Sequence, residues 1–152
     1  MKITQQLAKH LRDIHFGGNW TTSNFKNQLS GMSLVDAKRE VNSLNSIALL
    51  FIHSTYYVGV LRHVLEGNSL SSKDAHSFIL PPLSTQKDWD ELLEQTWENA
   101  EKAALLIEKL PDSILSEPFT DEKHGTWFRN ITGIIEHLHY HLGQIALIKK
   151  LL

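Results

Sequence analysis

The chain has 152 residues, of which 41% are hydrophobic and 21% are charged, and its formal net charge at pH 7 is -2. This length predicts one globular domain over residues 1–152, and the near-neutral charge provides no basic stripe for phosphates, so we expect no nucleic-acid partner. The absence of cysteine excludes disulfides, thiolate metal sites and a cysteine nucleophile, so any metal must take nitrogen or oxygen ligands.

The distribution of apolar residues argues against a membrane protein. No run of about 18 apolar residues is present, which is the length needed to cross a bilayer. Residues 1–15 alternate charged and apolar side chains and do not form the apolar centre of a secretory signal. We therefore expect no membrane partner and a cytoplasmic location.

Helical periodicity runs through the chain, and no segment alternates strictly as a half-buried strand does, which predicts an all-α protein. The first helix is predicted over about residues 2–14 and ends before Gly17. Its apolar stripe has three- and four-residue spacing: Ile3, Leu7, Leu11 and Ile14. A loop is expected over residues 16–32, with a short helical turn around residues 25–29. Asn19 and Trp20 in this loop are candidate pocket walls.

The second helix is predicted to begin near Ser33, which forms a capping pair with Asp36, and to end at Gly67, a typical left-handed terminator. Polar residues give it a candidate break: Asn42, Ser43 and Asn45. Residues 68–84 are rich in serine and proline and read as a long crossover loop.

The third helix is predicted over about residues 85–110, and Pro111 prevents its continuation. A second long connection contains Pro118 and Gly125. The fourth helix is predicted over about residues 127–151, with one inward stripe: Ile131, Ile134, Leu138, Leu142, Ile145 and Ile148. Four amphipathic helices with long crossover loops predict a four-helix bundle.

Three of the nine histidines fall within residues 137–141. His137 and His141 are four residues apart, which places them on one helix face, in the stripe that contains Ile134. His139 is rotated to the far side of the helix, where we expect it to be solvated. Each unpaired imidazole in an apolar interior costs roughly 1 to 3 kcal/mol, and one divalent ion would satisfy both.

A third ligand is predicted from the second helix, where His53 shares an inward stripe with Leu49 and Tyr57. Three neutral imidazoles would leave further coordination positions to water or substrate, as in catalytic sites. Imidazole accepts several divalent ions, so the ligand set does not identify the metal.

Two segments carry a resemblance to a known family. The segment Ile135–Ile145 resembles the last-helix signature of the DinB-like superfamily, in which two histidines four residues apart are followed by Gly-Gln and an aliphatic tail. Ser46–His53 resembles that superfamily's second-helix motif, which ends in the third ligand. The resemblance covers nearly the whole chain in order and spacing. It implies an up-down-down-up four-helix bundle, often a homodimer, with a three-histidine site for zinc or nickel.

Two polar side chains near the predicted ligands have open roles. Gln144 lies seven residues, about two turns, after His137 and so returns to the ligand face, where it could orient an imidazole or form a helix–helix hydrogen bond. Tyr57 could donate a proton beside the metal, or it could simply be a core residue. We expect Glu136 to be a surface carboxylate. Among the remaining histidines, His10 could be a fourth ligand or a core histidine, and we expect it in the core.

The other histidines are expected to be solvated: His15, His63, His76 and His124. The leading functional hypothesis is a metal-dependent hydrolase or thiol-dependent transferase that acts on a small-molecule substrate, with a low-molecular-weight thiol in the second case. The alternative is a non-catalytic, stress-linked bundle that binds a metal or small ligand. A third possibility is a structural homodimer in which the histidines only pack.

Overall fold

The computed structural model describes residues 1–152, of which 67% are helical, and it contains no strand. Four helices are long and three are short. The long helices are α1 (Ile3–Phe16), α4 (Ile47–Leu65), α6 (Gln86–Lys109) and α7 (Trp127–Lys149), and the short ones are α2 (Phe25–Leu29), α3 (Leu34–Lys38) and α5 (Asp74–Ser77). Two 3-10 helices, η1 (Asp112–Ser116) and η2 (Glu122–His124), lie between α6 and α7. The prediction of an all-α protein is confirmed.

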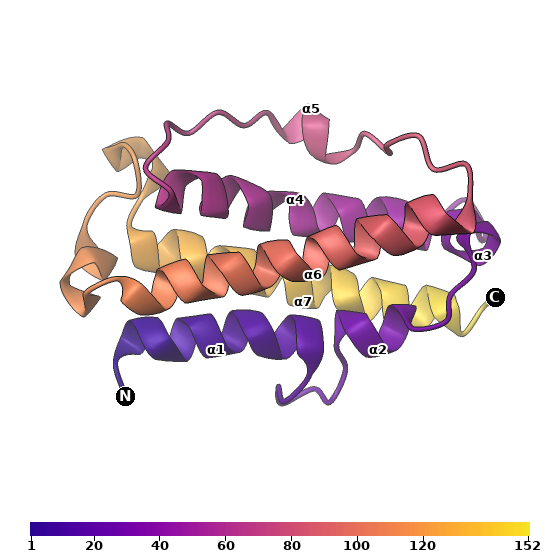
Figure 1. Ribbon diagram of the computed structural model, residues 1–152, viewed down its shortest axis with the longest axis horizontal. Coiled ribbons are helices and arrows are strands. Elements are labelled where there is room, and N and C mark those ends of the chain that lie inside the picture. The colour runs from indigo at the N-terminus through magenta and orange to yellow at the C-terminus, as the bar shows by residue number, and fades with distance from the viewer.

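The four long helices lie side by side along the length of the molecule (Figure 1). Both α1 and α4 pack against α6 and α7, so the four helices enclose a common core. The connection from α4 to α6 runs back along the whole bundle and carries α5, so α4 and α6 point in the same direction (Figure 1). This architecture is a helical bundle.

The three longest helices begin at hydroxyl caps. Ser46, Thr85 and Thr126 each accept a hydrogen bond from the backbone N–H three residues further along, at the starts of α4, α6 and α7 respectively. Such a cap contributes typically about 1 kcal/mol, because it satisfies a backbone donor that the helix leaves free. These caps fix where the two histidine-bearing helices, α4 and α7, begin.

One end of the core is filled by aromatic side chains. Phe51 of α4 lies at its centre, in edge-to-face contact with Phe25 and Trp97 at ring-centroid distances of 5.5 Å and with Trp89 at 6.0 Å. Phe25, Phe51 and Trp89 have no exposed surface. The short α2 therefore closes the core beside α1 and contacts α4 through Phe25 and Phe51.

Two histidine predictions are wrong. His15, expected to be solvated, is completely buried, because α1 continues to Phe16 and α2 covers its end. Its Nδ1–H donates to the Leu11 carbonyl at 2.7 Å, and its Nε2 has no partner. His10, expected in the core, is exposed. It was placed by its spacing from Ile3, and Ile3 itself is 48% exposed, so the buried stripe does not include that position.

The predicted second helix is two helices. Its N-terminal part is α3, capped as expected by the Ser33 hydroxyl on the Asp36 N–H, and the backbone then leaves the helix. Asn42 and Ser43 adopt positive φ angles of 48° and 65°, so the candidate break is confirmed. Gly67, with φ of 89°, follows the end of α4 and confirms the predicted terminator.

The composition of α4 also fits a membrane-spanning helix by length and hydropathy, and it is the one helix that does. Half of the apolar window is buried inside the bundle. A core helix passes the same test, so α4 is only weak support for a membrane protein and is consistent with a soluble bundle.

Candidate metal centre

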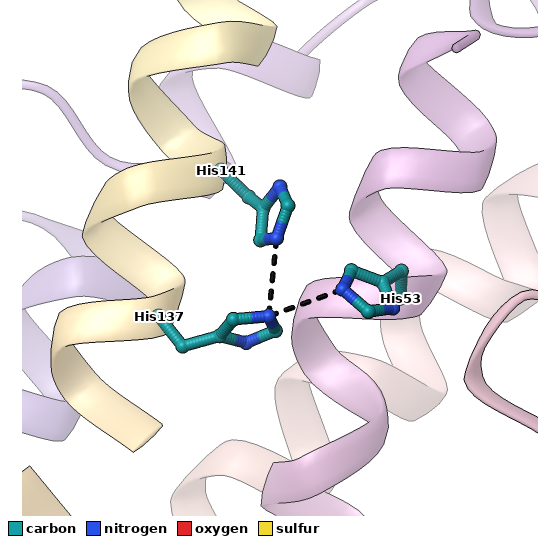
Figure 2. A group of neighbouring side chains, drawn as sticks. All are labelled: His53, His137 and His141. Atoms are coloured by element: carbon teal, nitrogen blue, oxygen red, sulfur yellow. Dashed lines mark hydrogen bonds between the residues drawn. The ribbon is translucent and has the colours of Figure 1, made fainter. Parts of the chain in front are cut away.

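The structure brings His53 of α4 together with His137 and His141 of α7, and we call these three residues the histidine cluster (Figure 2). The Nε2 atom of His137 lies 3.1 Å from Nε2 of His53 and 3.0 Å from Nε2 of His141. His53 and His141 are only 7% and 8% exposed, and His137 is half-buried. The three rings point toward one another from facing helices.

The tautomer of His53 is set by α5. Its Nδ1 lies 2.8 Å from the hydroxyl oxygen of Ser77, and that hydroxyl uses its single proton in a 2.6 Å hydrogen bond to the Asp74 carbonyl. Ser77 must therefore accept from His53, which places the ring proton on Nδ1. The Nε2 of His53 consequently presents a lone pair to the cluster. Phe78 stacks on the same ring at 4.0 Å and holds its plane.

The tautomer of His141 is set within α7. Its Nδ1 lies 2.7 Å from Oε1 of Gln144, an amide oxygen that can only accept. The proton is therefore on Nδ1 here too, and Nε2 again presents a lone pair. Of the two roles left open for Gln144, the structure shows the one that orients an imidazole.

His137 lies between these two lone pairs. Its Nε2 can donate at most one proton, so at least one of the facing nitrogens stays unsatisfied by protein groups. Its Nδ1 is buried without a hydrogen-bond partner. A single cation at the point of convergence would accept all three Nε2 lone pairs and leave each Nδ1 protonated.

Burial favours the neutral, ligating form of all three rings. Burial, followed by repulsion from His141 and His53, lowers the pKa of His137 to about 4. Burial also lowers the pKa of His53 and of His141, and in His141 the Gln144 hydrogen bond opposes that effect. The cluster is therefore uncharged at neutral pH, as metal binding requires.

The spacing of the nitrogens fits a small divalent ion. Two imidazole nitrogens in a tetrahedral zinc site lie about 3.3 Å apart, because each bond to zinc is about 2.0 to 2.1 Å. Two of the three separations between ligand nitrogens, 3.0 and 3.1 Å, differ from this by a few tenths of an ångström, and all three ligand atoms lie within 4.8 Å of one another. The residues present therefore fit a three-nitrogen site with further positions open.

A cavity of about 580 Å³ lies beside the cluster and is lined by His53 and His137. Tyr57 also lines it, with its ring centroid 5.3 Å from that of His137. The Tyr57 hydroxyl donates to the Asp74 carboxylate. Burial, followed by the bond to Asp74, raises the pKa of Tyr57, so its hydroxyl stays protonated at neutral pH.

Two residues predicted as pocket walls lie elsewhere. The Trp20 side chain is 99% exposed and does not line the cavity beside the histidine cluster, so that prediction is wrong. The Asn19 side chain organises its own loop: it donates to the carbonyls of Asp13 and Ser23 and accepts from the Thr21 N–H. The loop after α1 closes the aromatic end of the core and does not cap the histidine cluster.

The remaining histidine of the motif lies outside the cluster, as predicted. His139 is half-buried and its Nδ1–H donates to the Ile135 carbonyl within α7. Glu136 is exposed, as expected of a surface carboxylate.

Sequence reasoning missed Ser77 and Phe78, because they lie in a segment read as an irregular crossover loop. The structure forms α5 there and places it over His53, 24 residues earlier in the chain. The only local indication of this short helix in the sequence was Asp74, an acidic residue in its first turn.

Comparison of the chain with protein-family models, with curated proteins and with solved structures found no match.

Proposed function

We propose that the chain is a DinB-like, up-down-down-up four-helix bundle that binds one divalent ion, zinc or nickel, through the histidine cluster. The observation that supports this most is the convergence of the three Nε2 atoms, two of which have their lone pairs fixed inward by Ser77 and Gln144. The resemblance of Ser46–His53 and Ile135–Ile145 to that superfamily's motifs supports the same proposal.

Three protein ligands leave coordination positions for a small molecule, and a divalent ion lowers the pKa of the water or thiol in such a position. Hydrolysis and thiol transfer to an electrophile both need this chemistry. We therefore propose a metal-dependent hydrolase or a thiol-dependent transferase with a small-molecule substrate. In the transfer reaction the co-substrate is a low-molecular-weight thiol.

The chain's own residues would hold and shape this site. Ser77 and Gln144 fix the His53 and His141 rings, and Phe78 covers one face of His53 and keeps water from it. Tyr57 is the candidate proton donor, because its protonated hydroxyl lies on the cavity wall where Asp74 holds it.

Homodimer formation and a cytoplasmic location remain predictions. Apolar side chains of α7 offer a surface to a second copy: Tyr140 and Leu147, which are 64% and 60% exposed. These two residues are seven apart, about two helical turns, which places them on one stripe.

Turnover by metal-loaded protein tests the catalytic part of the proposal. We expect the zinc- or nickel-loaded chain to accelerate either hydrolysis of activated esters or attack of a small thiol on an alkyl halide. The rate should exceed that with free ion by at least about 100-fold, the scale of one positioned catalytic group. His137→Ala should remove this activity. Metal uptake without any turnover would contradict catalysis and favour the non-catalytic metal- or small-ligand-binding bundle.

A further inference from the structure

The cavity beside the histidine cluster extends along α7 toward its N-terminus. Its volume of about 580 Å³ suits a small molecule. His137, Gly133 and Arg129 all line it, and their four-residue spacing places them on one face of α7 in successive turns. Gly133 leaves the floor open, because a Cβ there would meet nothing within 4 Å. A ligand can therefore lie along this face between the two ends.

The far end of the cavity carries the cationic side chain of Arg129. The Arg129 side chain lies over the turn at Gly125, with its Cδ 3.0 Å from the position where a Cβ of that glycine would be. Gly125 has φ of +74° and carries no side chain to obstruct this approach. The Asn130 amide donates to the carbonyls of His124 and Thr126 at 2.9 and 2.8 Å, and so fixes this turn to α7.

The charges around the cavity are unequal. Arg129 makes no salt bridge, whereas Lys123, which also lines the cavity, has its ammonium 3.2 Å from a carboxylate of Asp121. The only carboxylate on the wall is Asp74, and it already accepts the hydroxyl of Tyr57. Three neutral imidazoles would add nothing to offset the charge of a bound ion. The cavity therefore favours a negatively charged ligand.

We propose that the substrate is a small molecule with an oxyanion group, a carboxylate or phosphate, that Arg129 binds while the opposite end reaches the histidine cluster. This inference rests on the metal-binding function proposed above. The planar guanidinium matches both oxyanions through paired N–H donors. Arg129 and His137 are eight residues apart, which is about 12 Å along the helix axis, so the substrate must span about that length.

Three thiols of equal chain length test this with zinc-loaded protein: 6-mercaptohexanoate, 6-mercaptohexyl phosphate and 6-mercaptohexan-1-ol. Zinc stoichiometry is measured first, and each Kd is then measured by calorimetric titration. We expect at least one of the two acids to bind about 10-fold more tightly than the alcohol, the scale of a hydrogen bond to a charged group. Whichever acid binds more tightly identifies the preferred oxyanion.

Substitutions then test whether Arg129 causes the tighter binding of the acid. Arg129→Gln should reduce it to less than about 3-fold and leave the Kd of the alcohol unchanged, because only the charged contact is removed. Arg39→Gln is the matched control: it changes net charge equally, and Arg39 lies outside the cavity beside Asp36. Gly133→Leu should weaken binding of all three thiols without changing zinc affinity, because its side chain fills the open floor.

The outcomes separate this inference from the function on which it rests. Zinc uptake with equal Kd values for the three thiols, or a preference that survives Arg129→Gln, overturns the assignment of an anionic substrate alone. A chain that takes up no zinc overturns the proposed function and this inference with it.

Discussion

Single substitutions of the histidine cluster are expected to abolish stoichiometric metal binding. Protein purified without a histidine tag should carry about one zinc or nickel ion per chain when loaded, and His53→Ala, His137→Ala and His141→Ala should each carry almost none. Each substitution removes one of only three protein ligands, so the loss in affinity should exceed the 10- to 100-fold, roughly, that follows removal of an outer-shell partner. Elemental analysis after dialysis measures the result.

Matched variants separate a lost ligand from general damage. His139→Ala should keep its metal, because His139 donates to a carbonyl of its own helix and faces away from the cluster. Ser77→Ala should keep stoichiometric metal but bind it about 10- to 100-fold more weakly, because it removes the acceptor that fixes the His53 tautomer. Equal metal loss in all of these variants would show that the fold, and not the ligand set, had been disrupted.

We expect the second largest effect from His15, because its buried ring should lower the free energy of unfolding as the pH falls. Burial lowers the pKa of His15 to about 4 from the ordinary histidine value of 6.5, although its bond to the Leu11 carbonyl opposes the shift. Between these values the unfolded chain binds more protons than the folded one, so stability falls as pH falls. From pH 7.5 to 5.0 this one residue should cost about 2 kcal/mol of unfolding free energy.

The comparison is made with His15→Leu in urea unfolding at both pH values with a chelator present. Leucine keeps the site filled between Phe16, Phe25 and Trp97, and it removes the titrating ring. The cluster histidines titrate equally in both proteins. The difference between wild type and variant in the loss of unfolding free energy from pH 7.5 to 5.0 is therefore due to His15. The same loss in wild type and variant would show that His15 does not titrate as a buried group.

The parts of the fold that follow from local periodicity were predictable. The stripe from Ile131 to Ile148 on α7 placed His137 and His141 inward, and the positions of Leu49 and Tyr57 did the same for His53 on α4. Because α4 and α7 pack against each other, inward histidines at the same height on the two helices lie close together. The capping residue Ser33 and the terminator Gly67 were also readable, because a cap acts within three residues of its own position.

The errors came from contacts that local sequence does not encode. His15 was read as solvated because two glycines follow it, although it lies four residues after Leu11 and so continues the buried stripe. Ser77 and Phe78 lie in the crossover segment and contact His53. Sequence periodicity does not predict where such a segment packs. Trp20 was predicted as a pocket wall because its loop could cap the open end of the bundle, but its side chain faces solvent.

X-ray absorption at the zinc edge of the loaded, untagged protein tests the central claim most directly. We expect a first shell that contains three imidazoles at about 2.0 to 2.1 Å, with the multiple scattering typical of histidine, and one or more oxygen ligands. A first shell with fewer than three imidazoles, or one unchanged by His53→Ala, would contradict a site shared between α4 and α7.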